Sequence, residues 1–98
     1  MQKHFALKTP GKVDQRLVEA VKGEVRKYVK RERRKKLPAS FTEWAFACRT
    51  GANRETATAC HVDEVVARID GIAQAGGAEI YIEILARPGH RPPPKAPL

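Results

Sequence analysis

The clearest secondary-structure signal in the chain is the run AEIYIEILA, residues 78–86. Ile80, Ile82 and Ile84 recur at every second position of this run, with Glu or Tyr between them. This two-residue period is typical of a strand that buries one face and leaves the other polar. We therefore predict a strand over residues 78–86.

The segment before this strand is expected to form a helix. Asp63 is a suitable N-cap residue, and Gly76-Gly77 would end the helix because glycine readily adopts the backbone conformation required there. Five apolar residues at helical spacing form the stripe of this helix: Val65, Val66, Ile69, Ile72 and Ala73.

Upstream of that helix the pattern indicates a hairpin of two strands. Glu43–Arg49 is the first strand, and Thr56–Val62, which is rich in Thr and Val, returns after the loop Gly51–Glu55. Three side chains are expected to share one face of the first strand: Trp44, Phe46 and Cys48.

The N-terminal part of the chain predicts a strand followed by a long helix. Residues Lys3–Leu7 alternate weakly and precede the turn residues Pro10 and Gly11. A helix is then expected to begin near Lys12, because apolar residues recur at helical spacing beyond it. The apolar residues of this helix are Val13, Leu17, Val21, Val25 and Tyr28.

The predicted order of elements is strand, helix, strand, strand, helix, strand (βαββαβ), which is typical of a ferredoxin-like two-layer sandwich. We therefore predict an α+β fold, in which a four-stranded antiparallel sheet carries both helices on one face. In this arrangement the second and fourth strands are the edges. A chain of 98 residues forms one domain, residues 1–86, and the Pro-rich residues 87–98 are predicted to be a flexible tail.

The positive charge of the chain is concentrated in two places. Between Arg26 and Lys36, eight basic residues and one acidic residue occupy eleven positions and carry +7 of the net charge of +8. Arg87, Arg91 and Lys95 add +3, and the rest of the chain sums to −2. Localised charge of this kind attracts a polyanion, an anionic membrane or an acidic partner.

The basic run lies at the end of the first predicted helix. No apolar residue occurs between Val29 and Leu37, so we expect residues 30–36 to project from the domain or fray. In the predicted topology this end shares one pole with the N-terminus, the exit of the tail and the start of the second helix, whose free amides favour anions. The two basic segments would then form one patch, with Gly51–Glu55 at the opposite pole.

Two segments of the chain resemble a known family. These are LVEAVKGEVRKYVKRERR, residues 17–34, and ILARPGHR, residues 84–91. They are similar to a family of small basic bacterial proteins classed as a domain of unknown function, and the resemblance covers nearly the whole chain. It implies a bacterial source and supplies no activity, substrate or site residue.

We expect a non-enzymatic domain that binds nucleic acid, RNA rather than DNA, through its basic pole. The residues assigned to this site are Arg26, Lys27, Lys30, Arg31, Arg33, Arg34, Lys35, Lys36, Arg87 and Arg91. Base stacking on the sheet is not favoured, because the outward positions offer a single tyrosine as a platform. Those outward positions are His4, Ala6, Tyr81 and Glu83. Trp44 and Phe46 would serve only if the faces of their strand were reversed.

The alternative function is a protein-interaction module. A sheet edge could pair with a second copy, which gives a monomer or a weak homodimer, or the basic pole could bind an acidic protein. A membrane partner is not expected, because the basic stretch beyond Val29 lacks the apolar face that an interfacial helix needs.

No other motif in the sequence indicates chemistry. A nucleophile motif, a phosphate-binding glycine loop and a carboxylate pair are all missing, so neither an enzyme nor a cofactor is expected. Cys48 and Cys60 lack the short spacing of a zinc site and are expected to be free, buried thiols. With no secretory signal and no run of ~20 apolar residues, we expect a cytoplasmic protein.

Overall fold

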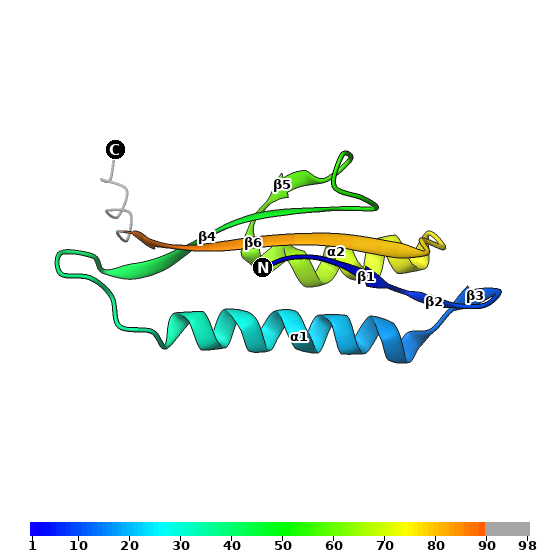
Figure 1. Ribbon diagram of the computed structural model, residues 1–98, viewed down its shortest axis with the longest axis horizontal. Helices are drawn as coiled ribbons and strands as arrows, with labels where there is room; N and C mark the ends of the chain where they lie inside the picture. The colour runs from blue at the N-terminus through cyan, green and yellow to red at the C-terminus, as the bar shows by residue number, and fades with distance from the viewer. Residues whose placement is uncertain (90–98) are drawn as a thin grey trace, which may run out of the picture.

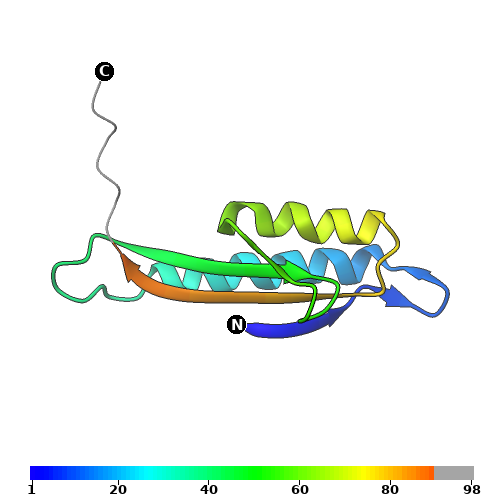
Figure 2. The same cartoon turned by 90° about the horizontal axis from the view of Figure 1, so that it is seen from above.

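The protein is a two-layer sandwich in the computed structural model, which describes residues 1–89 (Figure 1). Both helices cover the same face of one four-stranded sheet (Figure 2). The elements in chain order are β1 (Gln2–Ala6), β2 (Lys8–Thr9), β3 (Lys12–Val13), α1 (Gln15–Arg33), β4 (Glu43–Gly51), β5 (Thr58–Cys60), a 3₁₀ turn (Val62–Glu64), α2 (Val65–Gln74) and β6 (Glu79–Gly89).

The α+β class, the four-stranded antiparallel sheet and the two covering helices are confirmed, and the elements fit a ferredoxin-like sandwich. Across the sheet the strands lie in the order β1-β6-β4-β5. The edges are therefore β1 and β5, and the prediction that the second and fourth strands are edges was wrong. The physical reason is the apolarity of β6, whose residues Ile80, Ile82 and Ile84 are fully buried beneath the helices. A central position gives this strand a neighbour on both sides.

The first helix begins at Gln15 and not near Lys12. Lys12 and Val13 instead pair with β2 in a two-stranded ribbon, whose turn contains Gly11 at a φ of +95°. Asp14 is the N-cap, and its carboxylate accepts a hydrogen bond from the backbone N–H of Arg16 (2.9 Å). The ribbon thus uses the residues that would have formed an earlier helical turn.

The basic end of α1 is docked and does not project. The helix ends at Arg33, whose guanidinium lies over the Phe46 ring of β4, 5.4 Å from its centroid. Two residues later, the carbonyl of Lys35 accepts a hydrogen bond from the indole N–H of Trp44 (2.9 Å). The prediction of a projecting end was wrong because β4 supplies aromatic partners for arginine. The lack of apolar residues in this part of the helix gave no sign of such a contact.

The second helix is also capped differently from the prediction. Asp63 is not its N-cap, because the chain first forms a 3₁₀ turn that is capped by His61 and Glu64. The preceding strand β5 is limited to Thr58–Cys60, shorter than the predicted Thr56–Val62. The predicted stop is confirmed: Gly76 has a φ of +81°, and the chain turns there into β6.

The last strand extends further than predicted, to Gly89. Arg87 therefore belongs to β6, where it is the register partner of Ala45, and not to a tail. Pro88 is tolerated because this end of β6 pairs with β4 alone, so its missing N–H falls on the side that β1 does not reach. The remaining part of the predicted tail, residues 90–98, lies outside the described residues.

Candidate functional site

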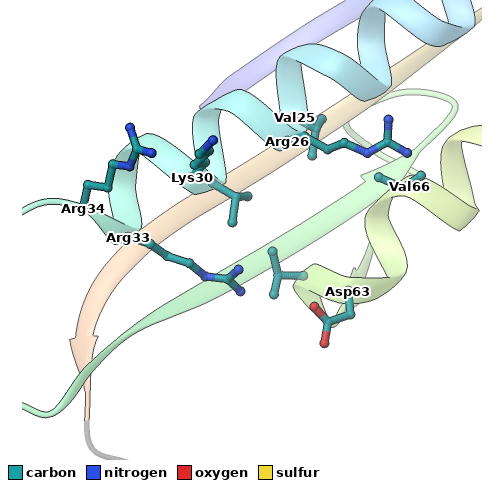
Figure 3. A pocket seen from close by; sticks show the side chains of 9 residues that line it. Val25, Arg26, Lys30, Arg33, Arg34, Asp63 and Val66 are labelled. Carbon is teal, nitrogen blue, oxygen red and sulfur yellow. The ribbon is translucent and has the colours of Figure 1, made fainter.

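A groove of about 450 Å³ lies between the C-terminal half of α1 and the start of α2 (Figure 3). Its apolar lining comes from both helices and the turn before α2: Val25, Val29, Val62 and Val66. Its charged lining consists of Arg26, Lys30, Arg33, Arg34 and Asp63. We call this site the basic groove.

The helical repeat explains why these four cations come together. Positions 26, 30, 33 and 34 follow the three- and four-residue spacing that places side chains on one face of a helix. Arg26 extends toward Val66, and Arg33 extends toward the start of α2 (Figure 3). Arg34 extends away from the groove and contributes to its outer rim (Figure 3).

None of these four cations forms an ion pair within residues 1–89. Some basic side chains elsewhere in residues 1–89 have acidic partners, whereas others, such as Lys8, Lys12 and Lys36, have none there. The pairs that join different elements are Lys3–Glu24, Lys22–Asp70 and Arg49–Glu83. The basic groove is therefore a concentration of charge that the described part of the fold does not neutralise, and its chemistry suits an anion with an apolar part.

The other predicted site residues are distributed over different surfaces. Lys27 lines a second groove beside β1, and Arg31 lies over the ring of Tyr28, 5.5 Å from its centroid. Lys35 is paired with Glu32 (2.7 Å), and Lys36 is exposed after the helix. Hydrogen bonding to Lys35 lowers the pKa of Glu32 and so keeps this carboxylate charged inside the basic run.

The predicted pole is present, but the two basic segments do not share a face. The basic end of α1, the start of α2 and the end of β6 lie toward the same pole (Figure 1). Arg87 follows Ala86, which is the register partner of the helix-facing Phe46. Because strand side chains alternate, Arg87 lies on the opposite face of the sheet from the basic groove. Arg91 lies outside the described residues.

The start of α2 offers fewer free backbone amides than expected. The backbone N–H of Asp63 donates to Nδ1 of His61 (3.2 Å), and the backbone N–H of Glu64 donates to the His61 carbonyl (2.9 Å). Two carboxylates, those of Asp63 and Glu64, already occupy this first turn. An anion in the basic groove would therefore meet the cationic side chains of α1 and not free amides of α2.

Among the described residues, the open face of the sheet has no exposed Phe, Tyr or Trp ring, and its exposed aromatic side chain is that of His4. Tyr81 is only 3% exposed, packs on His4 with ring centroids 4.9 Å apart, and donates its hydroxyl to Glu83 (2.8 Å). Trp44 and Phe46 face the helices, so the faces of β4 are not reversed. Tyr28 packs against the core as predicted, which leaves α1 without an exposed ring for stacking.

The two cysteines are free and directly opposite one another in the register of β4 and β5. Cys48 is buried, and this burial, with a smaller effect of Cys60, raises the pKa of its thiol to about 11. Cys60 is only half-buried, which differs slightly from the prediction. Residues 1–89 contain no group of three His, Cys, Asp or Glu side chains that could hold a metal ion.

Together these features define a small α+β domain with a basic groove between its two helices. The chain belongs to the family described as "Family of unknown function (DUF6172)", whose model matches residues 1–95. Searches of curated proteins and of solved structures find no match. In the described part of the chain, no helix is long and apolar enough to cross a membrane.

Proposed function

We propose that this domain binds nucleic acid electrostatically through the basic groove, that RNA is preferred, and that it acts in the bacterial cytoplasm without catalysing a reaction. The observation that carries the proposal is the set of four cations on one groove without ion pairs in residues 1–89. Neutralising phosphates releases bound counterions, which supports non-specific dissociation constants of about 10⁻⁴ to 10⁻⁶ M at physiological salt.

The shape of the groove favours a single strand over a duplex. A single-stranded backbone is flexible enough to follow a groove of about 450 Å³ between two helices. The valines line the groove beside Arg26 and Arg33, whose aliphatic parts can pack on them, and neither guanidinium has an ion pair within residues 1–89, although that of Arg33 lies over the Phe46 ring. Because the described open sheet face has no exposed Phe, Tyr or Trp ring, we expect binding through phosphates rather than bases and a weak sequence preference.

The test is the salt dependence of binding to a fluorescent single-stranded RNA, followed by anisotropy. Each phosphate contact contributes a slope of roughly −0.7 to log K against log salt, so the double variant Arg26→Gln/Arg33→Gln should reduce the slope by about 1.4. The matched control Lys8→Gln/Lys12→Gln removes the same charge from the β2–β3 ribbon and should change it little. Absence of binding to any RNA or DNA at low salt would contradict the proposal.

The alternative ligand of this groove is an acidic protein, and the valine lining is the observation that favours it. A helix carrying both carboxylates and apolar side chains would match both parts of the lining. The two functions differ in competition experiments. If the groove binds an acidic protein, polyglutamate and RNA of equal charge should displace that protein equally well. If the groove binds RNA, unlabelled RNA should displace the bound RNA better than polyglutamate of equal charge does.

A further inference from the structure

The two edges of the sheet differ in how they are protected. At the β5 edge, the guanidinium of Arg68 donates to the carbonyls of Thr58 and Ala59 (both 3.3 Å) and to the Thr58 hydroxyl (2.8 Å). This strand has three residues, and the Arg68 side chain already occupies the carbonyls of two of them. Strand edges that are blocked in this way do not serve as templates for another chain.

At the other edge, β1 presents backbone groups that have no partner within residues 1–89. Leu7 donates its N–H to Ala78 (2.9 Å), and Met1 accepts from the N–H of Ile84 (2.8 Å). In an antiparallel ladder alternate residues bond to the same neighbour, so the odd-numbered residues of this strand bond to β6. The backbone N–H and C=O groups of Gln2, His4 and Ala6 therefore point away from the sheet.

The usual protection of an edge strand is missing in β1. A lysine often blocks an edge, but Lys3 is held over the helix layer by Glu24 of α1 (3.2 Å) and lies over the Phe5 ring, 5.1 Å from its centroid. The strand contains no proline. Beside it lies a groove of about 740 Å³ that is lined by β1 and α1, with Phe5 and Leu17 among its apolar residues.

We infer that β1 is the interface of a homodimer, in which β1 of a second copy pairs antiparallel with it. Antiparallel pairing of identical strands generates a two-fold axis, the commonest symmetry of soluble oligomers. A register centred on His4 places His4 opposite His4 of the second copy, and Gln2 opposite Ala6. All the outward-pointing backbone groups of Gln2, His4 and Ala6 then exchange hydrogen bonds, and the sheet becomes continuous across the two copies.

The distribution of charge is compatible with a second copy at this edge. Contacts of Lys3 with Glu24 and of Met1 with Tyr28 show that α1 runs opposite to β1. Two-fold pairing therefore points the basic ends of the two α1 helices in opposite directions, so the charge concentrated in residues 26–36 is kept apart. The surface next to the interface carries both signs, with Glu24 and Lys27 on the same groove. A second copy is thus not repelled at this edge despite the net charge of +8.

The test uses proline at a position that faces away from the sheet. His4→Pro removes only the outward N–H, which leaves the bonds to β6 in place, whereas His4→Ala keeps that N–H. By light scattering and sedimentation at rising concentration, the wild type and His4→Ala should approach twice the mass of 10.9 kDa, and His4→Pro should remain monomeric. Ala6→Pro is the second edge variant if His4→Pro does not fold.

Amide hydrogen exchange in the wild type gives an independent readout. The N–H groups of Gln2, His4 and Ala6 should become protected as concentration rises, while exposed loop amides do not. A monomer at every concentration, free exchange of these amides, or an undiminished dimer of folded His4→Pro would overturn the inference. Dimerisation should persist between about 50 and about 500 mM NaCl, because salt screens repulsion between copies, whereas RNA binding should weaken. The two proposals can therefore fail separately.

Discussion

Lys22 of α1 and Asp70 of α2 form an ion pair between the two helices, with Nζ of Lys22 2.5 Å from Oδ1 of Asp70. The lysine side chain is 10% exposed and also contacts Glu19 (3.3 Å). Each partner lies one helical turn from a residue of the basic groove: Lys22 precedes Arg26, and Asp70 follows Val66. The pair therefore fixes the separation of the helices at the end of that groove.

Asp70→Asn should destabilise the fold and lower the midpoint of thermal unfolding by several degrees, because Lys22 loses its main partner. The hydrogen bond to Asp70 raises the pKa of Lys22 above its ordinary value of 10.5. The contribution of the pair is thus fully present below pH 10.5 and is lost as pH rises through the higher folded-state value. Circular dichroism melts from pH 7 to pH 11 should show that the difference in unfolding midpoint between the wild type and Asp70→Asn shrinks only above pH 10.5.

Glu55→Gln is the matched control for Asp70→Asn, because it removes the same charge from an exposed loop position. Its midpoint should equal that of the wild type. Equal midpoints for Asp70→Asn and the wild type at pH 7 would show that the ion pair does not hold the helices together.

Two glycine substitutions should have opposite effects on the free energy of unfolding. At Gly23, in the interior of α1, a new Cβ would meet no atom within 4 Å, so Gly23→Ala should stabilise by about 1 kcal/mol. At Gly77 a Cβ would lie 2.9 Å from the carbonyl oxygen of Ile72. Gly77→Ala should therefore destabilise by about 1–3 kcal/mol. Urea titrations measure both, and a stabilised Gly77→Ala would contradict the close packing of this turn.

The two thiols should differ in their rates of alkylation. Because the pKa of Cys48 is raised to about 11, only roughly 0.1% of it is thiolate at pH 8. Iodoacetamide should modify the half-buried Cys60 first, as read by peptide mass spectrometry. In urea both thiols should react at similar rates, which is the control. Equal rates in the folded protein would show that Cys48 is not shielded.

Trp44 should report on occupancy of the basic groove. It is the only tryptophan in the chain, and it lines a small cleft with Arg33, which also lines the basic groove. Neutralising Arg33 with a phosphate should change the emission of Trp44 in parallel with the anisotropy of the RNA. Trp44→Phe should retain RNA affinity, because its indole N–H bonds to a backbone carbonyl and not to the groove. RNA binding without any change in emission would place the ligand elsewhere.

Local periodicity predicted the elements of this fold better than it predicted their neighbours. Ile80, Ile82 and Ile84 identify β6 from their alternation, and Val65, Val66 and Ile69 identify α2 from their helical spacing. The central place of β6 depends on β1 and β4, which are far away in the sequence. Strand order is a property of these long-range pairings, so the period of a single strand cannot determine it.

The same distinction applies to the basic groove. The sequence shows that residues 26–36 are basic, and the helical repeat separates Arg26, Lys30, Arg33 and Arg34 from Lys27 and Arg31. The docking of Arg33 could not be predicted, because its partner Phe46 lies on a strand whose faces the sequence left open. The capping of the 3₁₀ turn by His61 was missed because histidine is not among the usual N-cap residues.

The contacts of the Arg68 guanidinium at the β5 edge bear on how many copies of the chain one continuous sheet could contain. A sheet with two free, self-complementary edges can add copies alternately at each edge, which produces an open-ended filament. Arg68 occupies the carbonyls of Thr58 and Ala59, which leaves β1 as the single free edge of each copy. An assembly formed through β1 alone would therefore end at two copies. In the inferred dimer, this one arginine side chain would separate a finite assembly from fibre growth.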